Sequence, residues 1–270
     1  KHNLGSGSGP HTEQIGGMII ALGKAIAKES PDMVYVYGDT NSTLAGAVAA
    51  VKLGVPLAHV EAGLRSFNRA MPEETNRILT DSVSSILFCP TMTAVRNLKA
   101  EGIERGVFRV EDVMLDMLVK YSRIAAKESK VLRSLNLARG AYYLATVHRS
   151  YNTDDVRRLK AMIRMFASLD RPVVFPIHPR TRKVLSDNRI KVSSNIICTD
   201  PVTYVDMLML EMNAAAILTD SGGVQKEAYF LKVPCITLRE ETEWVETVRS
   251  GWNILAGVDE GKVRRALKRL

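Results

Sequence analysis

Short apolar runs alternate with helical stretches along almost the whole chain, and this alternation constrains the fold more than any other feature of the sequence. The runs in the first half cover residues 33–37, 56–60, 86–89 and 107–110. Those in the second half cover residues 142–147, 173–177, 195–198, 214–218 and 235–238. Short apolar strands that alternate with helices of about 10–15 residues are typical of parallel sheets covered by helices on both faces. The sequence therefore predicts an α/β protein.

The alternation is interrupted between residues 113 and 136, where the sequence is helical in pattern and rich in charge. We place a domain boundary in this stretch and expect one domain over residues 1–118 and a second over residues 119–270. Each domain is expected to be Rossmann-like, and the two are expected to face each other. Ligands bind such sheets beyond the carboxyl ends of the strands. The residues that directly follow each strand are therefore the first candidates for a functional site.

Composition narrows the class of partner. The formal net charge of +8 would suit an anionic substrate, a nucleic acid or a membrane surface. Its densest cluster, residues 262–269, lies on an amphipathic stretch where solvated charge is the simpler interpretation, and no nucleic-acid-binding motif accompanies it. The most apolar region, residues 44–60, is interrupted by Lys52 and His59, so we predict neither nucleic-acid binding nor a membrane span.

The three cysteines, Cys89, Cys198 and Cys235, lie inside or at the end of apolar runs and lack the spacing of metal ligands. Buried free thiols in a reducing compartment explain them best. We therefore expect a cytoplasmic protein without a bound metal.

The strongest candidate site is the turn after the predicted strand at residues 214–218. Ser221, Gly222 and Gly223 open a helix there, and free N–H groups at a helix start favour a phosphate. Glu227 follows about one turn later, where its carboxylate would reach the two hydroxyls of a ribose. A plain glycine-rich turn is the alternative. The combination of strand, Ser-Gly-Gly and glutamate favours a nucleotide site.

Acidic residues follow the strands of the first half. Asp39 comes directly after one strand and Glu61 after the next, while Glu73 and Arg77 are four residues apart near the start of a helix. Taken singly, Asp39 could be part of a helix cap, and Glu73 with Arg77 a surface ion pair worth about a few tenths of a kcal/mol. Together these residues place three carboxylates near one sheet edge, which suits acid/base chemistry.

Two histidines, His148 and His178, follow consecutive strands of the second half. A lone histidine is usually structural. Two histidines at equivalent strand ends beside a predicted phosphate turn are better candidates for nucleotide contacts.

The motifs Gly38-Asp39-Thr40, His59-Val60-Glu61-Ala62-Gly63-Leu64-Arg65, Pro72-Glu73-Glu74-x-Asn76-Arg77, His148-Arg149, Thr219-Asp220-Ser221-Gly222-Gly223-x-Gln225-x-Glu227 and Thr242-Glu243 together resemble the UDP-N-acetylglucosamine 2-epimerase family. Their order and spacing match along essentially the whole chain. The run from Arg239 to Trp244 is most similar to the archaeal and related bacterial members. The resemblance implies the two-domain fold of one large glycosyltransferase class, GT-B, and an enzyme of polysaccharide biosynthesis. It also implies a UDP-sugar substrate, no cofactor and a homodimer.

The resemblance further implies conversion of UDP-N-acetylglucosamine to UDP-N-acetylmannosamine by elimination and re-addition of UDP. A hydrolysing branch of the family releases N-acetylmannosamine and UDP instead. In this family Asp39, Glu61 and Glu73 would be the acid/base candidates, with Arg77 in the same site and His148 facing the phosphates. The expected substrate contacts are His178, Ser221, Gly222, Gly223, Glu227, Arg239, Thr242 and Glu243.

The sequence also departs from the family pattern. The family's first strand and its Gly-Thr-Arg-Pro-Glu loop have no counterpart here, so we expect an incomplete first domain and a chain of impaired activity. Tyr151 replaces a usual glutamate, Glu111 a glycine and Leu115 a frequent tyrosine. A nucleotide-sugar-binding protein without catalysis and a glycosyltransferase of the same architecture remain alternatives. An acceptor requirement would identify the glycosyltransferase.

Overall fold

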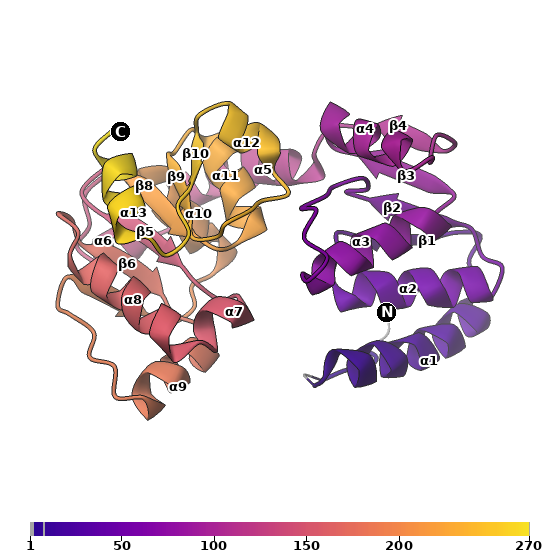
Figure 1. Cartoon of the computed structure of the whole chain (residues 1–270), viewed down its shortest axis with the longest axis horizontal. Coiled ribbons are helices and arrows are strands. Elements are labelled where there is room, and N and C mark those ends of the chain that lie inside the picture. The colour runs from indigo at the N-terminus through magenta and orange to yellow at the C-terminus, as the bar shows by residue number, and fades with distance from the viewer. Residues whose placement is uncertain (1–2, 8, 270) are drawn as a thin grey trace. The chain divides into compact units, whose positions relative to one another are not determined.

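The computed structural model describes residues 3–7 and 9–269, and the chain divides after Asp112 into two compact units (Figure 1). Each unit is built around a parallel sheet of its own, one of four strands and one of six. The predicted α/β class with two Rossmann-like parallel sheets is confirmed.

The sheet of the first unit has the strand order β1-β2-β3-β4. The elements of this unit are α1 (His11–Glu29), β1 (Val34–Tyr37), α2 (Asn41–Lys52), β2 (Leu57–Val60), α3 (Pro72–Val83), β3 (Ile86–Cys89), α4 (Met92–Ala100) and β4 (Val107–Arg109). Strand β2 is buried along its whole length. Strand β1 is an edge strand whose side chains Tyr35 and Tyr37 are exposed.

Helix α2 can lie close to the sheet because its buried residues are mostly small. A methyl group added to Gly46 would stand 2.9 Å from Cγ1 of Val36 on β1. Ala47, Ala49 and Ala50 pack with Val36 and Leu57 in one apolar cluster. The small side chains thus allow the helix to pack tightly on β1 and β2.

The sheet of the second unit has the order β10-β9-β8-β5-β6-β7. Its elements are α5 (Val113–Glu128), α6 (Val131–Ser134), β5 (Tyr143–Thr146), α7 (Ser150–Thr153), α8 (Val156–Ala167), β6 (Val173–Pro176), α9 (Pro179–Asp187), β7 (Ile196–Thr199), α10 (Tyr204–Asn213), β8 (Ala216–Thr219), α11 (Gly222–Leu231), β9 (Cys235–Thr237), α12 (Val245–Arg249), β10 (Asn253–Leu255) and α13 (Glu260–Leu267). The first strand lies in the middle, and the order reverses between β5 and β8. This is the strand order of a Rossmann sheet.

Alternate residues of β5 pack into two different cores. Tyr143 and Ala145 join a cluster that includes Phe166 of α8 and Val263 of α13. Leu144 joins a cluster with Leu210 of α10, Val224 and Ala228. Successive side chains of a strand point to opposite faces, so helices cover both faces of this sheet, as predicted.

The unit boundary falls slightly before the predicted position of 118/119. Leu118 and Ala125 of α5 pack with Leu208 of α10, so the whole of α5 belongs to the second unit. Within the described part of the chain, no helix has the length and apolar character that a membrane span requires.

Candidate functional site

The second unit places its predicted nucleotide residues at the point where the strand order reverses. His148 follows β5, and Ser221 follows β8, directly beside it in the sheet. The carboxyl ends of two such strands leave a crevice between their loops, where α/β proteins bind ligands. The sequence predicted both loops, and the observed strand order brings them together.

Ser221 is the N-cap residue of α11, and its hydroxyl accepts a hydrogen bond from the N–H of Val224. The N–H of Ser221 donates to the hydroxyl of Thr219, 2.9 Å away. These contacts fix the turn that carries Gly222 and Gly223 at the helix start. The N–H groups of the first helical turn have no partner within the helix and carry partial positive charge, so this turn suits a phosphate.

Asp220 ties the two loops together, a role that the sequence did not reveal. Its carboxylate accepts hydrogen bonds from the N–H groups of His148 and Arg149, each at 3.1 Å, and from the amide of Asn152 at 3.0 Å. The side chain is fully buried. The only sequence signal was its place beside Ser221. Asp220 therefore holds the loop after β5 against the turn after β8.

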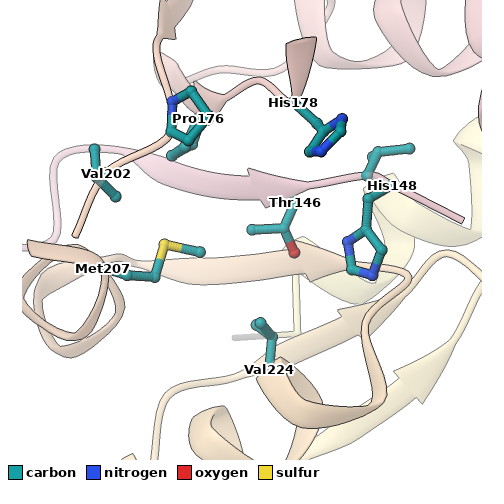
Figure 2. A pocket seen from close by; sticks show the side chains of 9 residues that line it. Thr146, His148, Pro176, His178, Val202, Met207 and Val224 are labelled. Carbon is teal, nitrogen blue, oxygen red and sulfur yellow. The ribbon is translucent and has the colours of Figure 1, made fainter. Parts of the chain in front are cut away.

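A pocket of about 290 Å³ opens beside this crevice (Figure 2). Figure 2 shows His148 and His178 at one end and the apolar side chains of Val202 and Met207 at the other. The complete lining comprises Thr146, Val147, His148, Pro176, His178, Pro201, Val202, Met207 and Val224. Mostly apolar walls with a few polar groups at one end suit the flat ring of a nucleotide base.

The two histidines differ in their surroundings. His178 is the N-cap of α9, and its Nδ1 accepts a hydrogen bond from the N–H of Arg180, so its Nε2 carries the proton. The side chain of His148 is 48% exposed, and its Nδ1 lies 3.6 Å from a carboxylate oxygen of Asp220. Both rings therefore retain hydrogen-bonding capacity at the pocket.

Glu227, the predicted ribose ligand, belongs to a cluster of buried acids. Burial raises the pKa of Glu227, while a hydrogen bond with Tyr204 lowers it in part. Glu211 of α10 is fully buried, and burial followed by the charge of Glu227 raises its pKa well above the ordinary value. Two buried carboxyl groups in contact cannot easily both be ionised. The pair therefore favours retaining a proton that two separate, solvated carboxyl groups would release.

Arg239, Thr242 and Glu243 support the Ser-Gly-Gly turn from within the protein. Nη2 of Arg239 forms a buried ion pair of 2.9 Å with Glu243, and a methyl group at Gly222 would collide with the Glu243 carboxylate. The hydroxyl of Thr242 donates to the side chain of Gln225, 2.7 Å away on α11. A side chain at position 222 would therefore require the Glu243 carboxylate to move from its place beside Arg239.

In the first unit, Arg77 contacts one of the three predicted acid/base residues, Asp39. This arginine is 1% exposed, and its Nε and Nη2 lie 3.0 and 2.9 Å from one carboxylate oxygen of Asp39. A second arm donates to Glu74, a buried residue that the sequence did not single out. Arg77 is buried and its side chain orients Asp39, so the surface location that a simple ion pair with Glu73 implied is wrong.

Glu74 also fixes the loop that follows Glu61. Its carboxylate accepts hydrogen bonds from the N–H groups of Ser66 and Phe67, both at 2.9 Å, and from the Ser66 hydroxyl. Its helical spacing from Arg77 and its place in the motif from Pro72 to Arg77 were the available signals. Glu74 is thus a structural neighbour of the predicted site.

Glu61 has an unusual backbone conformation. Its φ of +71° lies in the left-handed region, which costs a residue with a side chain about 1–2 kcal/mol. Such strain is concentrated at functional sites. A carboxylate oxygen of Glu61 lies 3.5 Å from the position a Cβ of Gly38 would take, so Glu61 stands beside the Gly38-Asp39 turn. Glu73 is half-buried on the first turn of α3.

Comparison with known proteins agrees with this architecture. The family model described as UDP-N-acetylglucosamine 2-epimerase matches residues 1–270. A UDP-N-acetylglucosamine 2-epimerase homolog of Methanococcus maripaludis is 54% identical, over 97% of this chain and 75% of its own length. A UDP-2,3-diacetamido-2,3-dideoxy-D-glucuronate 2-epimerase of Pseudomonas aeruginosa is 49% identical, over 92% of this chain and 70% of its own length.

Solved structures show the same likeness. The UDP-GlcNAc 2-epimerase of Methanocaldococcus jannaschii, in complex with UDP-GlcNAc and UDP, superposes with a TM-score of 0.94 at 48% identity, covering 100% of this chain and 77% of that one. A trehalose 6-phosphate synthase of Burkholderia multivorans, 16% identical with a TM-score of 0.56, shares the fold alone. On these grounds the chain belongs to the UDP-N-acetylglucosamine 2-epimerase family.

Proposed function

We propose that this chain interconverts UDP-N-acetylglucosamine and UDP-N-acetylmannosamine by acting at C2 of the sugar. The observation that carries the proposal is the Ser221 turn at the strand-order reversal, with a base-sized pocket beside it. Support also comes from the similarity to an enzyme in complex with UDP-GlcNAc and UDP.

The second unit would hold the UDP part of the substrate. The turn at Ser221, Gly222 and Gly223 would bind the pyrophosphate, and Glu227 the ribose hydroxyls. The base would occupy the pocket beside His178, with His148 towards the phosphates. The partial positive charge of the α11 start would also stabilise UDP as it leaves with its bonding electrons.

The first unit would supply the proton transfers. One carboxylate among Asp39, Glu61 and Glu73 takes the C2 proton while the bond from C1 to the UDP oxygen breaks, leaving a double bond between C1 and C2. A proton then returns to C2 on the opposite face, and the UDP oxygen adds back to C1. Arg77 would keep the Asp39 carboxylate in a fixed direction throughout.

The name of one relative supports a second candidate substrate. The Pseudomonas aeruginosa protein, named for a diacetamido-dideoxy-glucuronate, is as similar to this chain as the Methanocaldococcus jannaschii enzyme, at 49% against 48% identity. The same C2 chemistry applies to both sugars. The alternative substrate differs in carrying a carboxylate at C6 and an acetamido group at C3.

Proton NMR in deuterated water tests the proposal with each UDP-sugar in turn. We expect deuterium at C2 and the appearance of UDP-N-acetylmannosamine, both at a reduced rate. Free N-acetylmannosamine with UDP would indicate the hydrolysing reaction. If deuterium entered C2 of the diacetamido-glucuronate sugar alone, that sugar and not UDP-N-acetylglucosamine would be the substrate. UDP binding without any exchange at C2 would contradict the proposal.

Matched variants separate chemistry from folding. Glu61→Gln should lower C2 exchange by about 100- to 10,000-fold, the range for loss of one acid/base group, while UDP still binds. Glu104→Gln, at an exposed position before β4, should leave exchange unchanged. Equal activity of the two variants would remove Glu61 from the mechanism.

A further inference from the structure

His59, on the central part of β2, is fully buried, and both of its ring nitrogens face hydrogen-bond acceptors. Nε2 lies 2.7 Å from the carbonyl oxygen of Gly38, and Nδ1 lies 2.7 Å from Oδ1 of Asp81. A neutral imidazole has one donor and one acceptor nitrogen. A carbonyl oxygen only accepts, so Nε2 must carry a proton.

The surroundings of Asp81 assign the second proton. Its Oδ2 accepts hydrogen bonds from the N–H of Gly63 at 3.1 Å and from Nη1 of Arg65 at 2.7 Å, and the guanidinium charge favours the ionised carboxylate. An ionised carboxylate can only accept, so Nδ1 of His59 would donate to Oδ1. Arg65 also donates from Nε and Nη2 to Glu101, both at 2.7 Å. Two cations, His59 and Arg65, therefore face two anions, Asp81 and Glu101. This pairing offsets the free-energy cost of burying a charged imidazolium.

This network connects the two loops that carry acid/base candidates. The carbonyl that His59 holds belongs to Gly38, which directly precedes Asp39. The carboxylate that His59 holds also binds Gly63 in the turn after Glu61. We propose that His59, as a doubly protonated imidazolium, is a positioning residue that fixes the Gly38-Asp39 turn relative to Glu61. The role in turnover rests on the proposed function, whereas the charge state does not.

Two amide variants of His59 each retain one of the two hydrogen bonds that the imidazole ring makes. In His59→Gln the amide nitrogen reaches the place of Nε2 and retains the bond to Gly38. In His59→Asn it reaches the place of Nδ1 and retains the bond to Asp81 only. If His59 positions Asp39, His59→Asn should lower kcat by about 10- to 100-fold with KM changed less than about threefold, and His59→Gln should recover most of that loss. Equal losses in both variants, or a loss confined to thermal stability, would overturn the positioning role.

Two measurements need no turnover and therefore separate this inference from the proposed function. The ¹⁵N spectrum of histidine-labelled protein at pH 7.5 should show both nitrogens of His59 protonated, and a single neutral tautomer would overturn the imidazolium. Backbone amide exchange over residues 38–41 should be at least about tenfold faster in His59→Asn than in His59→Gln. Equal exchange would show that the contact with Gly38 fixes nothing, whether or not the protein epimerises its substrate.

Discussion

The buried acids Glu211 and Glu227 bear both on the stability of the protein and on the proposed binding of a ribose. The fully buried Glu211 has a strongly raised pKa because it lacks solvent and faces another carboxylate. Glu227 needs charge to accept hydrogen bonds from a ribose. The proposed ribose contact therefore needs the shared proton of this pair to lie on Glu211, the less accessible acid.

Replacing Glu211 by Gln should make stability less dependent on pH. The native protein retains a proton on Glu211 that the unfolded chain releases above about its ordinary pKa of 4.5. The wild type therefore loses stability as pH rises from that value towards the raised native pKa. Relative to the wild type, the free energy of unfolding of Glu211→Gln should rise by about 1.4 kcal/mol for each unit by which the native pKa of Glu211 is raised.

Urea unfolding followed by circular dichroism at pH 5, 6.5 and 8 measures this difference. Glu128→Gln, at an exposed position near the end of α5, serves as the control. Parallel stability curves for wild type and Glu211→Gln would show that Glu211 is ionised in the native protein.

Asp220→Asn tests the link between the two nucleotide loops. The asparagine amide would face the N–H groups of His148 and Arg149 that now donate to the carboxylate. Loss of such charged hydrogen bonds should lower the free energy of unfolding by about 1.5–3 kcal/mol. UDP binding, measured by calorimetry, should also become weaker. Asp200→Asn removes an ion pair at a side chain that is 89% exposed, so it should have little effect on either quantity.

Residues that are proposed to touch a ligand were easier to single out in the sequence than the residues that support them. Ser221 and Asp39 follow strands and belong to short motifs. Asp220, Asp81 and Glu74 act through contacts with backbone N–H groups of distant loops, for instance Asp81 with Gly63. Such partners are defined only after the chain has folded. No spacing rule links Asp39 to Arg77, whose carboxylate and guanidinium come from different elements.

At the scale of elements, glycines shape the turns that connect helices to strands. Gly102 and Gly106, between α4 and β4, both have left-handed backbones, with φ of +80° and +72°. A methyl group at Gly106 would collide with the carbonyl of Ser85, whereas a methyl group at Gly102 would meet nothing within 4 Å. Substitutions at Gly102 and Gly106 therefore distinguish the cost of a left-handed backbone from the cost of a steric collision.

Alanine at these two positions should destabilise the protein to different degrees. Gly102→Ala should cost about 1–2 kcal/mol from the left-handed backbone alone. Gly106→Ala should cost a further 1–3 kcal/mol or so, because the carbonyl of Ser85 must move and with it the start of β3. Chemical denaturation measures both values, and similar costs at the two positions would show that the turn relaxes freely.

The sequence predicted most strands but missed β10 and could not predict strand order. Strand β10, Asn253–Leu255, is short and begins with asparagine, a residue that is depleted in strands, so it does not show the apolar run of the other strands. The order β5 beside β8 depends on long-range pairing such as Leu144 with Ile217, which leaves no local pattern. That pairing decides which loops form the crevice.

At the scale of the whole molecule, UDP binding should stabilise one unit rather than the chain as a whole. The proposed UDP contacts, among them Ser221, Glu227 and His178, all belong to the second unit. A ligand that binds only the native form stabilises it by about 2.7 kcal/mol at 100 times its dissociation constant, which corresponds to roughly a 100-fold slowing of amide exchange that requires unfolding of that unit.

Hydrogen exchange with UDP should therefore slow in β5, β8 and α11 and remain unchanged in β2, the buried strand of the first unit. Glu227→Gln should reduce the protection, because it removes the charge that would bind the ribose, and Glu104→Gln should not. Equal protection of β2 and β8 would mean that UDP alone also engages the first unit. Protection of β2 only with the complete UDP-sugar would instead indicate that the sugar, and not the nucleotide, engages the unit that carries Asp39 and Glu61.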